Sequence, residues 1–140
     1  MSEGEREKVI RYWWSKSEES LASARREVDA GSNGFAVNRL YYAAFYGVSA
    51  ALLERRLSFR KHSGVRAAFH RDFIKTGLLD VEWGKLYDQL FEDRQEGDYV
   101  AMISFDRDYV ESQITRCGNF LIALRPLISV LSPEGRPKNP

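Results

Sequence analysis

The chain has 140 residues, of which 44% are hydrophobic, 13% aromatic and 29% charged. This length and composition predict one domain with a packed core, and they exclude a chain that is disordered throughout. The 21 basic and 20 acidic residues leave a net charge of +1. Any contact with nucleic acid must therefore come from a local patch rather than from the field of the whole molecule.

Features of the chain as a whole favour a cytoplasmic protein. The single cysteine, Cys117, cannot form an internal disulfide, which fits a reducing compartment. The charged N-terminus lacks the apolar stretch of a signal peptide, and no apolar run approaches the ~20 residues that cross a bilayer. Two histidines, His62 and His70, are too few for a typical zinc site. We expect neither a metal nor a cofactor.

The first half of the chain predicts two long helices. Apolar residues recur at three- and four-residue steps over residues 5–30, and Gly31 is placed to end this helix. A second helix is predicted over residues 35–56. Its small residues permit close contact with neighbouring helices; they are Ala43, Ala44, Gly47, Ala50 and Ala51.

The second half predicts three more helices. Ser63 is a candidate N-cap for a short one that Gly77 ends, and Asp80 is a candidate cap for the next. Gly97 is expected to interrupt that fourth helix. The fifth starts at Ser104 or Asp106, and Pro126 kinks or ends it.

No segment alternates with a period of two, so no strand is predicted. Long helices joined by short turns favour antiparallel neighbours. We therefore predict an all-α, up-and-down bundle of four main helices plus a shorter one, over residues 5–130. Residues 131–140, which are rich in proline, are predicted to be a disordered tail.

Two segments carry more polar and aromatic detail than a core requires. They are Asn38-Arg39-Leu40-Tyr41-Tyr42-Ala43-Ala44-Phe45 and Arg94-Gln95-Glu96-Gly97-Asp98-Tyr99. Together with Lys61-His62-Ser63-Gly64-Val65, which lies between them, they resemble the HEPN domain family, the nucleotide-binding domain named for higher eukaryotes and prokaryotes, and in particular its small prokaryotic stand-alone members. The resemblance extends from about residue 13 to residue 124.

The resemblance implies a helical bundle that forms a homodimer. Many members of the family are metal-independent endoribonucleases that act as toxins, often with a minimal nucleotidyltransferase as antitoxin. Their motif is an Arg followed, after four to six residues, by a His, often with a Tyr just beyond. Carried onto this sequence, the resemblance gives Arg94, Asp98 and Tyr99 as candidate catalytic residues. It gives Asn38, Arg39, His62 and Arg94 as candidate nucleotide- or RNA-binding residues.

The chemistry of that motif depends on both of its members. A guanidinium binds phosphate through a forked pair of donors, and a histidine that titrates near neutrality can move a proton. Here Asp98 stands where the histidine is expected. A carboxylate with an ordinary pKa of about 3.9 is an anion at neutral pH, so it repels phosphate, although it can still act as a base.

Other pairings are possible on the sequence alone. Arg55 and Arg56 also precede His62 by the motif's spacing, but they straddle a helix end, so His62 is interpreted as a loop or cap residue. His70 is interpreted as a solvated helix residue, and Arg39 could meet Asp98 across the bundle as an architectural contact. A basic cluster is either a candidate contact for a phosphate-rich partner or an ordinary solvated surface; it comprises Arg55, Arg56, Arg60, Lys61, Arg66 and Arg71.

Three functional hypotheses follow. The first is a toxin–antitoxin or defence-type protein that acts with a nucleotidyltransferase on RNA or nucleotides. The second is a non-catalytic module that binds a nucleotide or a protein, with Arg94 as the phosphate contact. The third makes Tyr99 a site where the partner enzyme attaches a nucleotide.

Overall fold

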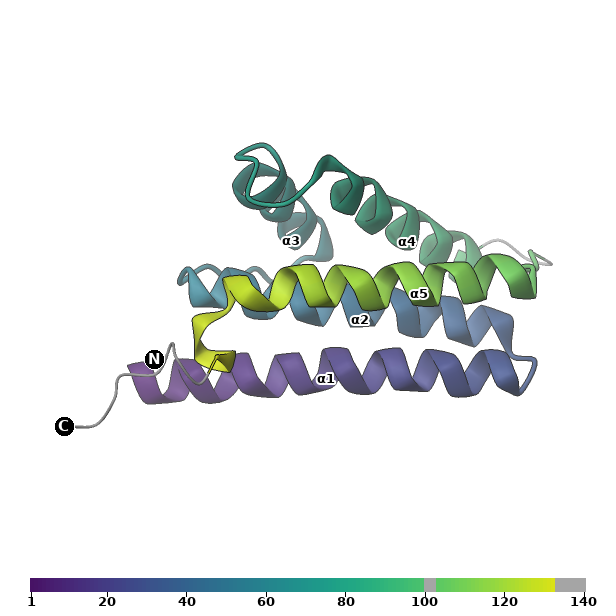
Figure 1. Ribbon diagram of the computed structural model, residues 1–140, viewed down its shortest axis with the longest axis horizontal. Helices are drawn as coiled ribbons and strands as arrows, with labels where there is room; N and C mark the ends of the chain where they lie inside the picture. Colours follow the sequence, from purple (N-terminus) through teal and green to yellow (C-terminus); the bar gives the residue numbers. More distant parts are fainter. Residues whose placement is uncertain (100–102, 133–140) are drawn as a thin grey trace.

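The computed structural model describes residues 1–99 and 103–132, and within them it contains helices and no strand. Five α-helices follow one another along the chain (Figure 1). They are α1 (Glu3–Asp29), α2 (Asn33–Glu54), α3 (His62–Phe69), α4 (Val81–Tyr99) and α5 (Arg107–Leu124). The prediction of an all-α bundle with four long helices and a shorter one is confirmed.

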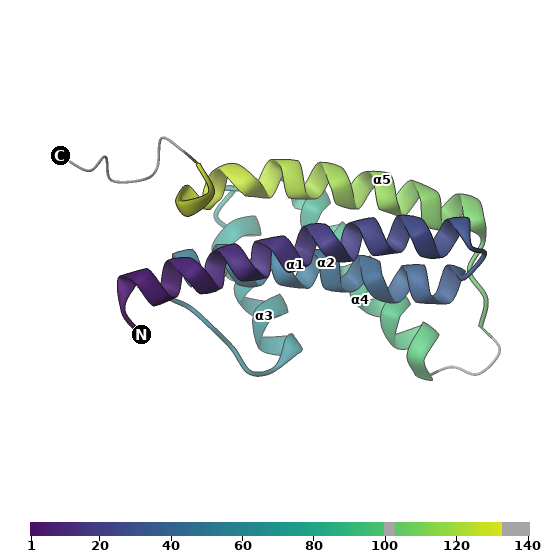
Figure 2. The same ribbon diagram turned by 90° about the horizontal axis from the view of Figure 1, so that it is seen from below.

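Helix α2 is the central element of the bundle. Helices α1, α2 and α5 run along the long axis of the molecule, whereas α3 and α4 are inclined to them on one side (Figures 1 and 2). α2 contacts all four of the other helices. Its sequence explains this position, because 13 of its 22 residues are buried and a helix that is apolar on most sides belongs in the interior.

Several helix ends follow the predicted signals. Gly31 and Gly77 have φ angles of 82° and 79°, a conformation that glycine adopts without strain, and they follow α1 and the α3 region. Asp106 is the N-cap of α5 and accepts a bond from the Tyr109 amide. Pro126 lies in the 3₁₀ turn that follows α5, as expected of a residue that ends a helix.

Two boundary predictions were wrong. Ser63 does not cap α3, because the cap is Lys61 and His62 is already the first helical residue. Gly97 does not interrupt α4, which continues to Tyr99. A Cβ at Gly97 would lie 3.3 Å from the Phe105 ring, so this glycine admits a close neighbour rather than ending the helix.

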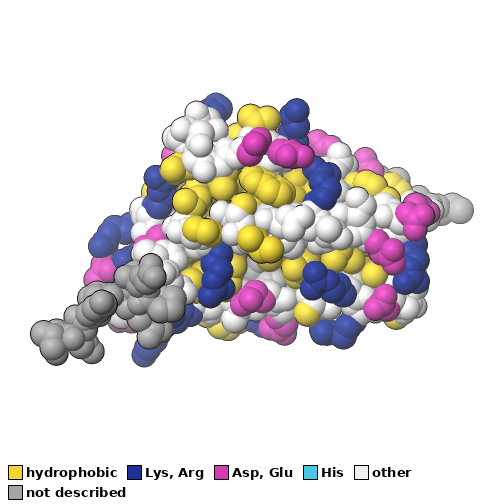
Figure 3. Space-filling view, in the orientation of Figure 1, with side chains coloured by type: hydrophobic (Ala, Val, Ile, Leu, Met, Phe, Trp, Pro, Cys, Tyr) yellow, Lys and Arg dark blue, Asp and Glu magenta, His cyan; other side chains and the backbone are white. Residues whose placement is uncertain are grey.

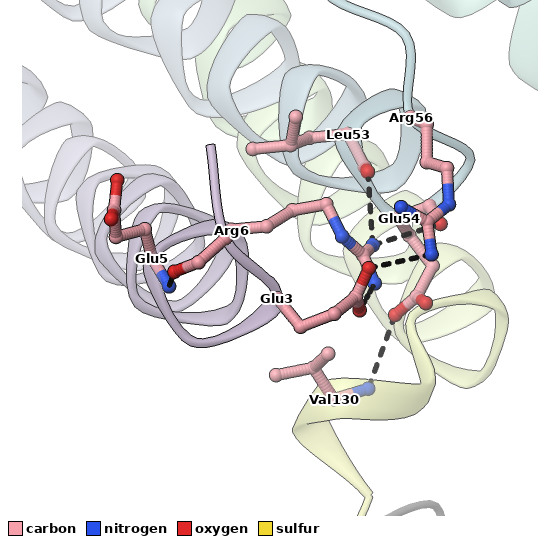
Figure 4. Close-up of polar contacts among 8 residues, drawn as sticks. Glu3, Glu5, Arg6, Leu53, Glu54, Arg56 and Val130 are labelled. Atoms are coloured by element: carbon pink, nitrogen blue, oxygen red, sulfur yellow. Dashed lines mark hydrogen bonds and ion pairs between the residues drawn. The ribbon is translucent and has the colours of Figure 1, made fainter.

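A polar cluster ties the beginning of α1 to the end of α2 (Figure 4). Arg6 Nη1 donates to the backbone oxygens of Leu53 and Glu54, at 3.2 Å each, and so satisfies carbonyls that the helix end leaves open. Glu54 in turn accepts a bond from the Val130 amide at 3.2 Å. The segment after α5 is thus fastened to the same end of the bundle.

The last described residues belong to this packing. Leu131, the first residue of the predicted tail 131–140, ends a 3₁₀ turn and lies against the core, while residues 133–140 fall outside the described residues. None of the helices in the described part of the chain combines the length and apolar composition of a membrane span.

Candidate functional site

Arg94 lies on the side of α4 that faces α2, on two tyrosine rings. The carbon of its guanidinium is 5.0 Å from the centre of the Tyr41 ring and 5.3 Å from that of Tyr42. Both tyrosines come from the middle of α2, and Tyr41 is fully buried. The side chain of Arg94 keeps 18% of its surface exposed. Stacking on aromatic faces fixes the plane of the guanidinium and leaves an edge for another partner.

His62 meets Arg94 in this place. The Nη1 atom of Arg94 lies 3.4 Å from the Nδ1 atom of His62, across 32 positions of sequence. The imidazole ring packs 4.3 Å from the ring of Phe45 and 5.6 Å from that of Tyr41. We call the contact of the two side chains the Arg94–His62 pair.

The return of the chain after α2 explains how the pair forms. Residues 55–61 leave the end of α2 and bring the first turn of α3 back onto α2, beside Phe45. Val65, one turn further along α3, is buried in the core and holds the helix there. His62 is therefore fixed at the first position of a short helix, while Arg94 comes from the last third of α4.

The surroundings of His62 favour its neutral form. Burial lowers the pKa of His62 below its ordinary value of 6.5, and the positive charge of Arg94 lowers it further. A guanidinium only donates hydrogen bonds, so Nδ1 is the acceptor in the pair and Nε2 carries the hydrogen. A neutral imidazole has the charge state that a general base needs.

The surroundings of Tyr41 favour the protonated form of its hydroxyl. Burial raises the pKa of Tyr41 to about 12, although the positive charge of Arg94 opposes that rise. Its hydroxyl stays protonated, and its ring serves as a platform. The platform that Tyr41 and Tyr42 give to Arg94 was not anticipated from the sequence.

Asp98 pairs with Arg94 rather than with Arg39. Its Oδ2 atom lies 3.2 Å from Nε of Arg94, one helical turn earlier on α4. The contact is an ion pair without hydrogen-bond geometry, because Arg94 Nε is buried and makes no hydrogen bond. In the described residues no ion pair joins Arg39 to Asp98, so the proposed lock between them does not form in this conformation.

Asn38 and Arg39 lie on the other side of Asp98. Together with Gly97 and Asp98 they line an open pocket of about 510 Å³ between the start of α2 and the end of α4. This pocket adjoins the Arg94–His62 pair through Asp98. The structure thus brings the predicted binding residues to one side of α2. Tyr99 is the last residue of α4, and its side chain falls outside the described residues.

His70 is not a solvated surface residue. Its Nε2 atom lies 2.8 Å from Oδ1 of Asp88, and the same oxygen accepts a bond from Arg66 Nε at 2.8 Å. Seventy-two per cent of the His70 side chain is covered, since 28% is exposed. The residue begins a π-helical turn, His70–Ile74, that extends α3.

Most of the predicted basic cluster is engaged with acceptors of the chain. Arg56 pairs with Glu3 at 2.6 Å, Arg55 donates to a backbone oxygen, and Arg66 and Arg71 pair with aspartates. Arg60 and Lys61 differ. Both are exposed, and neither has an ion-pair partner in the part of the chain that the structure describes. They directly precede His62. Of the predicted basic cluster, only these two residues therefore remain as cations without an ion-pair partner in the described residues, next to the Arg94–His62 pair.

The donor set of this region suits anions better than metals. The described residues contain no group of three or more His, Cys, Asp or Glu side chains placed to hold a metal ion. Cys117 is buried and its burial raises the pKa of the thiol to about 12, so it is inert as a nucleophile. Guanidinium, imidazole and lysine groups close to one another are instead typical of a site for phosphate.

A comparison with known proteins shows which family the chain resembles. The model of the HEPN domain matches residues 10–126. The chain is 46% identical over 127 residues to the UPF0332 protein of Thermotoga maritima, an alignment that covers 91% of this chain and 96% of that protein.

Two archaeal relatives carry names that refer to toxins. The candidate toxin MJ0142 of Methanocaldococcus jannaschii is 38% identical over 107 residues, which is 76% of this chain and 70% of that protein. The candidate toxin MJ0605 of the same organism is 31% identical over 85 residues, 61% of this chain and 63% of that protein. With the family model matched across nearly the whole bundle, the chain belongs to the HEPN domain family.

Proposed function

We propose that this HEPN protein is a toxin that cleaves RNA without a metal ion, with Arg94 as the phosphate ligand and His62 as the general base. The observation that carries the proposal is the 3.4 Å contact between Arg94 Nη1 and His62 Nδ1. The motif around Arg94 has Asp98 in place of its histidine, and we assign the role of that histidine to His62 of α3. The toxin names of the two archaeal relatives support the same class of function.

The proposed reaction is an internal transesterification of the RNA chain. His62 accepts the proton of a ribose 2′-hydroxyl, whose oxygen forms a bond to the adjacent phosphorus. The bond from phosphorus to the 5′-oxygen of the next nucleotide breaks, and that oxygen takes a proton from water. The products are a 2′,3′-cyclic phosphate and a 5′-hydroxyl. Arg94 stabilises the charge that builds on the phosphoryl oxygens.

Substrate binding would prepare both groups for this step. In the free protein Arg94 donates toward Nδ1 of His62 and pairs with Asp98. A phosphate that draws the guanidinium toward itself frees the Nδ1 lone pair to act as a base. Arg60 and Lys61, exposed beside His62, add positive charge along the path of the RNA backbone. We further propose that the protein works as a homodimer in the cytoplasm and is neutralised by a nucleotidyltransferase partner.

The test is an RNA-cleavage assay in the presence of a chelator. Arg94→Ala and His62→Ala should each slow cleavage about 10²- to 10⁴-fold, the range typical of lost acid–base or charge stabilisation. His70→Ala is the matched control, because His70 is the other histidine of the chain and is engaged by Asp88. No cleavage by the wild type, or equal cleavage by wild type and Arg94→Ala, would reject the proposal.

A second candidate function is nucleotide binding without cleavage. It is favoured by Asp98, whose charge offsets that of Arg94 at 3.2 Å. In that case calorimetry should show binding of mononucleotides by the wild type and weaker binding by Arg94→Ala, while RNA remains intact. Absence of binding to ATP, GTP, AMP and short RNA would remove this candidate.

A further inference from the structure

A small aromatic pocket lies beside the Arg94–His62 pair. It is formed by α1, α2, the segment after α2 and α3, and it encloses about 90 Å³. Aromatic rings make up much of its wall, and two serines contribute polar atoms. We call it the aromatic pocket, and the lining residues that matter here are Trp13, Phe45, Ser49, Ser58, Phe59 and Val65.

Phe45 connects this pocket to the pair. Its ring lines the pocket and also lies 4.3 Å from the ring of His62. Along α2 the order is therefore Tyr41 and Tyr42 under Arg94, then Phe45 against His62, then the aromatic pocket one turn further on. A molecule that places a phosphate on Arg94 can extend past His62 into the pocket without leaving the surface of α2.

The pocket has free polar groups as well as aromatic walls. The Ser49 and Ser58 side chains accept and donate no hydrogen bond within the described part of the chain, although Ser49 is only 7% exposed. A purely apolar ligand would leave these hydroxyls unpaired, which costs free energy in a buried place. A nucleobase suits both features, because its faces stack on aromatic rings and its edges carry donors and acceptors.

The size of the pocket selects among bases. A cavity of about 150 Å³ holds a single benzene ring in a well-studied protein. At about 90 Å³ this pocket is smaller, so it can take a base only in part and the remainder of the base must lie outside the enclosed space. A pyrimidine leaves less of its ring system outside than a purine does. The pocket therefore favours pyrimidines over purines.

We infer that the aromatic pocket binds a pyrimidine base, that of the nucleotide whose 3′-phosphate lies on Arg94. The inference rests on the proposed function for the direction of the chain: the nucleotide that carries the attacking 2′-hydroxyl is the one next to His62. The nucleotide on the 3′ side then falls toward Asp98 and the open pocket lined by Asn38 and Arg39. Cleavage would follow pyrimidines.

Calorimetry tests the inference without requiring cleavage. The probes are cytidine 3′-monophosphate, adenosine 3′-monophosphate and inorganic phosphate. Cytidine 3′-monophosphate should bind at least about ten times more tightly than inorganic phosphate, as expected from one base stacked in an aromatic site. The affinity of adenosine 3′-monophosphate should exceed that of phosphate by a smaller factor. Ser49→Val and Phe59→Ala should each remove this advantage. Tyr12→Ala is the control, since Tyr12 is 55% exposed on α1 and does not line the pocket.

The outcomes separate this inference from the proposed function. Equal affinity for all three probes, no binding of any probe, or an unchanged preference in both pocket variants would overturn the inference. If the pyrimidine preference is found but RNA is not cleaved, the pocket stands and the ribonuclease proposal fails. Two variants are used because Ser49 is buried and its replacement could disturb folding, whereas Phe59 lies on the exposed segment before α3.

Discussion

At the scale of single residues, the contact between Arg94 and His62 sets the charge of the site. Arg94 makes protonation of His62 unfavourable, and burial has a larger effect in the same direction. The motif places Asp98 where a histidine is expected. Asp98 pairs with Arg94, and His62, which lies outside that motif, contacts Arg94 as well.

The lowered pKa of His62 predicts a pH dependence of stability. Because its pKa is below 6.5 in the folded protein, the unfolded chain takes up a proton at His62 more readily as the pH falls through that value. Protonation therefore favours unfolding. Between pH 7.5 and pH 5.5, urea denaturation should show a larger loss of unfolding free energy for the wild type than for His62→Gln. Identical pH dependence in the two proteins would contradict the assigned environment.

The sequence named Arg94 and His62 as separate candidates and did not predict their contact. His62 was a binding candidate from a short motif, and Arg94 was a catalytic candidate from another. Helical periodicity says which residues share a face of one helix, yet the contact of His62 with Arg94 depends on the path of residues 55–61 and on the tilt of α4. No local sequence pattern predicts the path of these residues or the tilt of α4. For the same reason the burial of His70 against Asp88 was missed.

At the scale of elements, a buried carboxylate joins α4 to α5. Asp93 is 5% exposed and accepts hydrogen bonds from the Tyr109 hydroxyl and from Gln89 Nε2, the latter at 2.8 Å. Burial raises the pKa of Tyr109 most, and the hydrogen bond to Asp93 raises it further. The phenol therefore keeps its proton and donates to Asp93. Asp93 directly precedes Arg94, which makes this contact part of what positions the guanidinium.

Loss of that donor should destabilise the protein. Tyr109→Phe leaves Asp93 buried with one fewer partner, and we expect a loss of about 1–3 kcal/mol in the free energy of unfolding. Chemical denaturation measures it. Tyr12→Phe removes a hydroxyl from a residue that is 55% exposed and should change stability little. Equal stability of Tyr109→Phe and the wild type would show that the bond between α4 and α5 contributes nothing.

Gly47 lies where α1, α2 and α5 pack closely together. A Cβ built there would lie 2.9 Å from Leu121 Cδ2 on α5 and 3.2 Å from Ser17 Oγ on α1. Ser17 cannot withdraw freely, because its hydroxyl donates to the Ala43 carbonyl of α2 at 2.5 Å. The prediction that small residues on α2 permit close helix contact is borne out at this position.

Replacement of this glycine tests the packing. Gly47→Ala should reduce the melting temperature and cost about 1–3 kcal/mol, the range for overpacking a filled core. Gly4→Ala is the control, because no atom lies within 4 Å of a Cβ at that position. It should leave stability unchanged or raise it by about 0.5 kcal/mol, since alanine is the better helix former. An unchanged melting temperature for Gly47→Ala would mean that α1 and α5 can move away from α2 at this position at little cost in free energy.

At the scale of the whole molecule, the surface leaves apolar side chains uncovered. Hydrophobic residues gather along α5 and between α5 and the inclined pair of helices (Figure 3). Ile122 on α5 is 71% exposed and Phe35 at the start of α2 is 68% exposed. A contiguous apolar patch, rather than single exposed side chains, is typical of a surface that another protein covers.

The family resemblance and these residues together predict a homodimer. Light scattering should give about twice the 16.1 kDa of one chain, and replacement of an interface residue by a charged one should shift the population toward the monomer. Ile122→Glu and Phe35→Glu are suitable variants because both positions are exposed, so the fold of the single chain should tolerate the change. A monomer at all accessible concentrations would contradict this prediction.

The separation of His62 and Arg94 by 32 positions has a consequence for synthesis. A ribosome releases the histidine well before the arginine, and the aromatic rings of α2 that hold both groups appear earlier still. The nascent chain therefore carries only half of the pair until α4 has emerged and docked on α2. The Arg94–His62 pair, on which the proposed function depends, can therefore form only after α4 has left the ribosome.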